Sequence, residues 1–248
     1  PSTLCTAVIE WANGRWLRAY GTFSHPNVFG GFLAFGLVST AAVVGRGRLK
    51  HVALLFWLAA AMMGGAMVMT ASRGAWLAAA LGLIVFVVGH RWIGRGDVWR
   101  KARSPILLAL MVAVIVAVSL SPILRTRFDP SNRLEERSVA ERIGQWSEWA
   151  SVVRHGAATM IVGGGVGSYP FLLQSVRPLQ AVWVYQPIHN VPALIVAELG
   201  ILGALAALLF VVATDWEAHR RWRRSEAVTA MALGTVVLVL ALTDHYLW

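Results

Sequence analysis

The stretch HNVPALIVAELGILGALAALLFVVAT, residues 189–214, decides the fold. It is apolar over enough residues to cross about 30 Å of hydrocarbon at about 1.5 Å per residue. It nevertheless opens with His189 and Asn190 and carries Glu198 inside the apolar run. Ionisable groups in membrane segments face protein or a polar cavity rather than lipid. The stretch therefore predicts a membrane helix whose first residues have a functional role.

Composition places the whole chain among membrane proteins. Of its 248 residues, 57% are hydrophobic and only 14% are charged, whereas about a quarter of a soluble domain is charged. The net charge of +10 comes from basic residues between apolar runs, which indicates membrane topology rather than nucleic-acid binding. Cys5 is the single cysteine, which excludes an intrachain disulfide and a cysteine-built metal site. Because the chain lacks a starting Met, we expect a fragment of a larger protein.

Six stretches are long enough to span a bilayer, which predicts an all-α polytopic membrane protein. They are residues 27–45, 51–70, 73–90, 104–124, 190–212 and 227–246. The loops 45–51, 91–103 and 213–226 together carry twelve Lys and Arg residues, whereas Arg73 alone flanks the turn at 71–72. Basic loops stay in the cytoplasm. The other connections are therefore expected to face outward.

The outward segments complete the expected organisation, in which the whole chain is one membrane domain. Residues 1–26 form an outer loop, where Asn13-Gly14 predicts a tight hairpin. Four membrane helices follow in 27–124, and two more lie in 190–248. Between them, 125–189 is a large periplasmic loop, too long to be an unstructured connector. It contains an amphipathic helix with Ile143, Trp146, Ala150 and Val153 on one face, then a glycine-rich turn at 163–167.

Two arginines on the outward side are candidate anion-binding residues. Arg73 begins the third span, on the side that the distribution of basic residues disfavours. It is interpreted either as an arginine that snorkels to the headgroups or as a fixed cation that holds a phosphate. Arg142 lies one helical turn before Trp146. It either belongs to an ordinary solvated helix face or contributes to the same anion site.

The candidate residues at the fifth span have different expected roles. His189 and Asn190 lie at a helix N-terminus, which attracts anions, and a histidine there is suited to general base catalysis. A polar cap at the interface is the simpler interpretation. Glu198 follows about 13 Å along the helix, where structural pairing is expected. Gly200 and Gly203 have a spacing that permits close helix packing, which is a supporting role.

Several kinds of site lack a sequence signal. No HxxH, HExxH, DxD or CxxC spacing occurs on the outward side, so the sequence gives no support for a catalytic metal. The glycines at 163–167 lack the lysine and strand context of a nucleotide-binding loop, and no Gly-x-Ser-x-Gly elbow is present. We therefore expect neither a metal nor a cofactor.

Taken together, these motifs resemble the bacterial O-antigen ligase and polymerase superfamily. The pattern HN-x9-GxxG is met by His189, Asn190, Gly200 and Gly203. The stretches GTFSHPNVFGGFL (21–33), TASRGAWLAA (70–79), ERIGQW (141–146), GGGVGSYPF (163–171) and DHYLW (244–248) resemble family segments in the same order. The resemblance covers about residues 20–248. Members of the superfamily usually have more than six spans, so further helices are expected outside this chain.

The resemblance implies a metal-independent, inverting glycosyltransferase of the bacterial inner membrane, with its active site on the periplasmic face. Such an enzyme moves a glycan from an undecaprenyl-diphosphate carrier to a sugar of lipid A core, to a growing glycan or to a protein. By position, Arg73 and Arg142 would hold the diphosphate, and His189 would activate the acceptor hydroxyl. Both a ligase and a polymerase fit this resemblance.

Two other functional classes were weighed against the enzyme. A transporter or flippase of a lipid-linked or anionic solute would show ionisable residues near the midplane of several spans. Here Glu198 is the one clearly deep carboxylate, and the other polar candidates gather at one face. A structural scaffold explains the spans but not the outward Arg and His residues. The sequence therefore favours the transferase.

Overall fold

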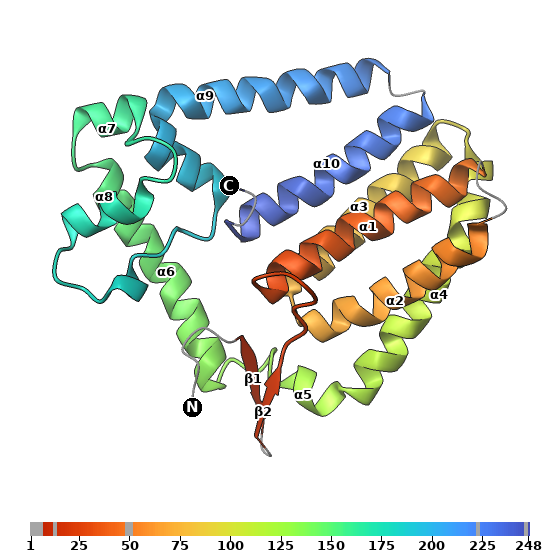
Figure 1. Ribbon diagram of the computed structural model, residues 1–248. Helices are drawn as coiled ribbons and strands as arrows, with labels where there is room; N and C mark the ends of the chain where they lie inside the picture. The colour runs from red at the N-terminus through yellow and green to blue at the C-terminus, as the bar shows by residue number, and fades with distance from the viewer. Residues whose placement is uncertain (1–6, 12–13, 48–51, 222–223, 246–247) are drawn as a thin grey trace. The chain divides into compact units, whose positions relative to one another are not determined.

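The computed structural model describes residues 7–11, 14–47, 52–221, 224–245 and 248. Within these residues, six helices are long and apolar enough to cross a membrane, which confirms the all-α polytopic fold (Figure 1). They are α1 (Pro26–Arg46), α2 (Ala53–Thr70), α3 (Arg73–Trp92), α4 (Gly96–Ser119), α9 (Val191–Arg220) and α10 (Ser225–Thr243). The short helix α5 (Ser121–Arg125) follows α4 at the end of the expected fourth span. The segment expected to form the large loop contains α6 (Arg133–Val153), α7 (Ala157–Val162) and α8 (Tyr169–Val176).

Helix boundaries extend beyond the apolar stretches that predict them. The fourth helix begins at Gly96 rather than near residue 104, and α9 continues to Arg220 rather than ending near 212. Hydropathy marks only the part of a helix that can lie in hydrocarbon, whereas its backbone hydrogen bonds continue into the interface. The basic residues of 100–103 are therefore helical.

The chain forms two compact units. The first contains the described residues up to Glu135 together with Ala218–Val239, and the second contains Glu136–Glu217 and Leu240–Trp248. The first unit thus includes α1 to α5 and most of α10. The second includes most of α6, together with α7, α8, most of α9 and the end of α10.

Small residues allow the helices of the first unit to approach closely. Helix α1 packs against α2, α3 and α4, and α2 also packs against α4. A Cβ added at Gly64 would lie 2.2 Å from the Ala109 carbonyl oxygen, so only glycine permits the approach of α2 to α4. Close packing of this kind associates helices in lipid, where the hydrophobic effect does not drive them together. An apolar cavity of about 480 Å³ remains among α1 to α4.

A β-hairpin precedes the first membrane helix. Strands β1 (Val8–Trp11) and β2 (Gly14–Leu17) pair antiparallel, with Trp11 opposite Gly14. Asn13, at the expected turn, lies outside the described residues. The hairpin packs through buried Ile9 against the end of α2 and against α5. Its base is fixed by Arg18, whose Nε donates to the Thr70 carbonyl oxygen at 2.7 Å.

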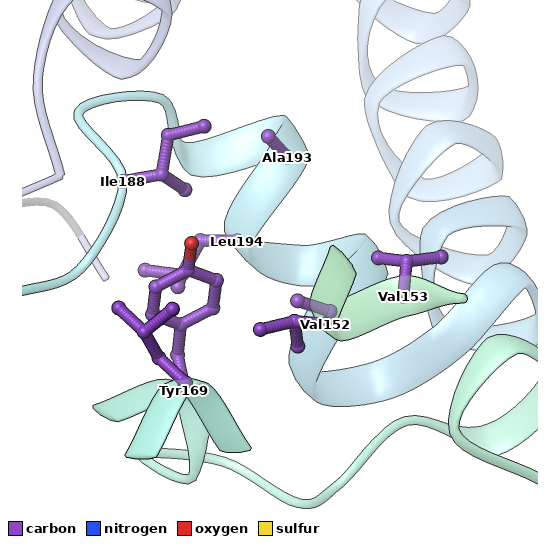
Figure 2. Packing of buried hydrophobic residues seen from close by; sticks show 8 residues of the cluster. Val152, Val153, Tyr169, Ile188, Ala193 and Leu194 are labelled. Atoms are coloured by element: carbon purple, nitrogen blue, oxygen red, sulfur yellow. The ribbon is translucent and has the colours of Figure 1, made fainter. Parts of the chain in front are cut away.

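The second unit has its own hydrophobic core. Figure 2 shows the ring of Tyr169 pointing toward Ile188 and Leu194. The core residues are Val152, Val153, Tyr169, Leu173, Ile188, Ala193, Leu194 and Ala197. Helix α6 is therefore amphipathic, and only part of its expected face is buried. Val153 lies in this core, whereas Ile143 and Trp146 are 67% and 50% exposed, because only the end of α6 that carries Val152 and Val153 packs against α8 and α9.

Helix α9 is broken at Gly200. This residue has φ 67° and ψ −173°, a conformation that is essentially restricted to glycine. The backbone of α7 and its following turn approaches here, and a Cβ on Gly200 would lie 2.2 Å from the Ile161 carbonyl oxygen. The expected role of Gly200 in packing two membrane helices thus changes. It admits a loop and ends the first part of α9, while Gly203 lies against Leu199 of its own helix.

Substituting Gly200 by Ala should therefore destabilise the protein. The left-handed backbone alone costs roughly 1–3 kcal/mol, and the added methyl group must displace a carbonyl oxygen. Gly234→Ala is the matched control, because a Cβ there meets nothing within 4 Å and alanine favours a helix by about 1 kcal/mol. Thermal unfolding of the full-length protein in detergent should show a lower melting temperature for Gly200→Ala alone. Equal melting temperatures would contradict the close approach.

Candidate functional site

His189 is held by Gln145 of α6. The backbone N–H of His189 donates to Oε1 of Gln145 at 3.2 Å, and His189 Nδ1 lies 3.0 Å from the same oxygen. The Trp149 indole, one turn further along α6, donates to the carbonyl oxygen of Ala193 at 2.7 Å. Two contacts one helical turn apart therefore fix α6 against the start of α9.

The double contact also defines the tautomer of His189. A backbone N–H can only donate, so the Gln145 atom that faces it must be the amide oxygen. That oxygen accepts and cannot donate, so Nδ1 of His189 must carry its proton toward Gln145. In the neutral imidazole the lone pair then resides on Nε2. His189 is thus arranged to accept a proton at Nε2.

Asn190 caps the helix that follows His189. Its side-chain oxygen accepts from the backbone N–H of Ala193 at 2.9 Å, a contact typical of a helix N-cap. Its amide nitrogen donates to the carbonyl oxygen of Leu242 at 3.1 Å. Asn190 therefore starts α9 and joins it to the end of α10, which matches a supporting role.

Glu198 is a buried carboxylate that binds a loop. Its side chain accepts the backbone N–H of Gly167 at 2.7 Å, the backbone N–H of Tyr169 at 3.1 Å and the Trp248 indole N–H at 2.6 Å. Glu198 is only 2% exposed, and charge-assisted hydrogen bonds of this kind replace the lost hydration. The residue thus stabilises the 163–169 turn and the end of the described chain.

The break at Gly200 makes these contacts possible. A helix that ends leaves carbonyl groups without intrahelical partners. Two of them, those of Ala197 and Glu198, accept the backbone N–H groups of Gly164 and Gly165 at 3.3 and 2.8 Å. The glycine-rich turn therefore docks on a helix end, through both the backbone and the carboxylate of Glu198.

Tyr169 stays neutral in this environment. Burial raises the pKa of its phenol well above the usual range, and the nearby Glu148 carboxylate adds to the shift, whereas Arg177 opposes it. The ring is fully buried in the core of the second unit. Tyr169 therefore acts as an aromatic packing residue and not as an ionised group at physiological pH.

Arg73 is part of an ion-pair cluster in the first unit. Its guanidinium lies 3.0 Å from Oε2 of Glu135 and donates to the Arg127 carbonyl oxygen at 3.0 Å. Arg127 pairs with the other oxygen of the same carboxylate. Two guanidiniums thus share one carboxylate, which leaves a net positive charge. Arg73 itself is 41% exposed at the side chain, so it is neither a simple snorkelling arginine nor a fully sequestered one.

Arg142 is exposed on α6, three residues before Gln145. Residues three apart on a helix are neighbours on its surface, so Arg142 lies on the part of α6 that holds His189. Arg73 belongs to the first unit and Arg142 to the second. Their joint role in binding one anion therefore stays a prediction.

Two residues near the end of α10 join His189. Metal-ligating atoms of His189, Asp244 and His245 all lie within 4.8 Å of one another. The rings of His189 and His245 meet edge to face, with centroids 4.7 Å apart. His189 lies 55 positions before Asp244, so no spacing motif marks this cluster.

The family of the chain follows from residues 58–208, which match the profile of O-antigen ligase. The match covers more than half of the sequence. The chain belongs to the O-antigen ligase family. It is thus a membrane glycosyltransferase of the O-antigen ligase type, as the resemblance of its motifs predicts. No curated protein and no solved structure matches it.

The match with the O-antigen ligase family contains every candidate residue named from the sequence: Arg73, Arg142, His189, Asn190, Glu198, Gly200 and Gly203. It also contains Gln145, Arg127 and Glu135, which sequence reasoning missed. Nothing in their spacing marks these three, because their contacts depend on tertiary packing. Asp244 and His245 lie beyond the matched region.

Glu198→Gln tests the role of the buried carboxylate in this member of the O-antigen ligase family. An amide offers one acceptor oxygen where two are used, so its NH₂ group must face at least one N–H donor. Leaving buried polar groups unsatisfied costs about 1–3 kcal/mol each. We expect a clearly lower melting temperature for the full-length protein in detergent. The exposed Glu136→Gln removes the same charge without such contacts, and its melting temperature should stay within about 2 °C of wild type.

Proposed function

We propose that the protein transfers a glycan from an undecaprenyl-diphosphate carrier to an acceptor hydroxyl, without a metal and with inversion at the anomeric carbon. The acceptor is a sugar of lipid A core, a growing glycan or a protein. The reaction takes place on the periplasmic face of the bacterial inner membrane. The observation that carries the proposal is the tautomer of His189, which Gln145 holds with its lone pair on Nε2.

His189 acts as the general base in this proposal. Nε2 accepts the proton of the acceptor hydroxyl while the hydroxyl oxygen attacks the anomeric carbon. The new glycosidic bond forms as the bond between that carbon and the diphosphate oxygen breaks, so attack from the opposite face inverts the configuration. Partial burial and the contact with Gln145 limit rotation of the ring, which supports a fixed approach of the hydroxyl.

Arginine side chains stabilise the leaving diphosphate in this proposal. Negative charge grows on its oxygens as the glycosidic bond breaks, and guanidinium groups bind such oxygens in a bidentate manner. Arg73 and Arg142 are assigned this role. The carboxylate of Glu135 orients Arg73 and Arg127 together, so Arg127 supports the position of Arg73. Prearranged cations of this kind supply the stabilisation that other glycosyltransferases obtain from a metal.

The apolar cavity of the first unit suits the lipid part of the donor. Its volume of about 480 Å³ lies within the range of small-molecule sites. Its lining includes Trp76 and Phe128, whose rings pack 6.2 Å apart. Trp76 follows Arg73 by three residues, and Phe128 follows Arg127 directly. A chain in the cavity would therefore end close to the arginine cluster, as a polyprenyl diphosphate requires.

The first test compares glycan transfer by variants of the full-length protein in vesicles, with a synthetic polyprenyl-diphosphate glycan and a chelator present. His189→Ala should lower the transfer rate by roughly 10²–10⁴-fold, the usual contribution of a general base. Arg73→Ala should lower it by roughly 10²-fold, the usual loss for a single charge-stabilising group. Arg100→Ala, an exposed arginine of the expected cytoplasmic side, should retain the wild-type rate.

Protein abundance in the vesicles is the necessary control for this test. Wild-type transfer by His189→Ala at equal abundance would remove the base assignment. Transfer that requires an added metal would remove the proposed metal independence. Movement of the intact lipid-linked glycan across the bilayer, without transfer, would replace the transferase by a flippase.

The role of Gln145 as a positioning residue has a separate test in the pH dependence. Gln145→Glu places a carboxylate beside Nδ1, which favours the imidazolium form of His189. The acidic limb of the transfer rate against pH should therefore move to higher pH. Gln145→Leu should lower the rate at all pH values, because the ring loses its acceptor. A Gln145→Glu profile that coincides with wild type would contradict the contact as the control of proton acceptance.

A further inference from the structure

The cluster of His189, Asp244 and His245 has the composition of a metal site. Two imidazoles and one carboxylate are the ligand set of many catalytic zinc sites, which use three protein ligands and keep a fourth position open. All three residues lie in the second unit, and their ligand atoms are within 4.8 Å of one another. Asp244 is buried and the two histidines are half-buried, so the donors are partly shielded from water.

The distance between Asp244 and His245 fits a shared ion. Nδ1 of His245 lies 3.3 Å from Oδ1 of Asp244. The same Oδ1 accepts the backbone N–H of His245 at 2.8 Å, which keeps the two side chains together, and within the described part of the chain Nδ1 of His245 is buried without a hydrogen bond. Zinc bonds of about 2.0–2.1 Å in a tetrahedron separate neighbouring ligand atoms by about 3.3 Å. The pair thus already has the ligand spacing of a tetrahedral zinc ion.

His189 has the outer contact that zinc-binding histidines use. A histidine that ligates a metal through one nitrogen almost always donates its other ring N–H to an oxygen acceptor. Nδ1 of His189 donates to Gln145 Oε1 at 3.0 Å. The lone pair of the neutral ring is then on Nε2, which is the nitrogen that can ligate a metal ion. The wider pairs of ligand atoms lie within 4.8 Å of one another, so small shifts of the side chains are sufficient for the tetrahedral spacing.

The two segments that carry the ligands are fixed to each other. Asn190, the residue after His189, donates to the carbonyl oxygen of Leu242 at 3.1 Å. Leu242 lies two residues before Asp244. The Trp248 indole donates to Glu198 at 2.6 Å, three residues past His245. These contacts restrain the start of α9 and the end of α10, so little further ordering is needed for three ligands to converge.

We propose that His189, Asp244 and His245 bind Zn²⁺ and that the bound ion inhibits the enzyme. Two nitrogen donors favour zinc over magnesium or calcium, which prefer oxygen ligands. Coordination occupies Nε2 of His189, so this nitrogen no longer accepts a proton from an acceptor hydroxyl. The inhibitory half of the inference rests on the proposed function, in which His189 is the base. The binding half is independent of it.

Zinc binding is tested on the full-length protein in detergent, after removal of metal and by competition with a chromophoric zinc chelator. Wild type should bind one Zn²⁺ more tightly than His245→Ala by at least about tenfold, because losing even an outer-shell partner of a metal ligand costs about 10–100-fold in affinity. His245→Gln, closer in size, should show the same loss, and unchanged melting temperatures exclude misfolding. His155→Ala removes an exposed histidine of the same unit and should bind zinc like wild type. Equal affinity of wild type and both His245 variants would overturn the site.

Inhibition is tested by glycan transfer with and without added Zn²⁺, each rate being compared with that of the same variant in chelator. Zinc should lower the wild-type rate, chelator should restore it, and the His245 variants should resist zinc. Zinc that binds wild type at this site yet leaves transfer unchanged, or stimulates it, would overturn the inhibitory role. If no form transfers glycan, the proposed function fails, whereas the chelator competition still decides the binding site.

Discussion

The carboxylate of Glu198 is the interaction on which the second unit depends. A charge that is 2% exposed persists only with several donors around it, and here Gly167, Tyr169 and Trp248 supply them. These donors come from the glycine-rich turn and from the segment after α10. One buried anion on α9 therefore fixes two other pieces of chain to this helix. Because Gly200 ends the helix just after Glu198, the anion lies at a helix end, where loop N–H groups can reach it.

The same principle governs the arginines of the first unit. A guanidinium beside apolar helices needs an anionic or carbonyl partner, and Arg73 and Arg127 share Glu135. A single carboxylate between two cations fixes their positions without cancelling their charge. The diphosphate of the proposed donor would meet cations whose side chains are already ordered, which would reduce the entropy that binding has to overcome. Structural pairing and substrate binding are thus compatible roles for Arg73.

Local features of the sequence were sufficient to predict the six membrane helices, because the hydropathy and the length of an apolar stretch depend only on neighbouring residues. The same reasoning found only part of the buried face of α6. Val153 of the expected face lies in the core beside Val152, whereas Ile143 and Trp146, which match the same helical period, are exposed. Gln145 and Arg127 were missed for a related reason. A polar residue on a helix gains meaning only from the tertiary contact that it makes, and no spacing in the sequence encodes that contact.

The polar start of α9 has a physical explanation in two parts. Asn190 caps the helix and joins it to α10. It thereby supplies hydrogen-bond partners to backbone groups, which lipid cannot do. His189 lies just outside that cap, with its ring held by Gln145 from α6. Removing the cap would allow the first turn to fray and would move His189 with it, whereas removing Gln145 would leave the helix intact and free only the ring. The cap therefore determines where the imidazole lies, and the glutamine determines which ring nitrogen carries the proton.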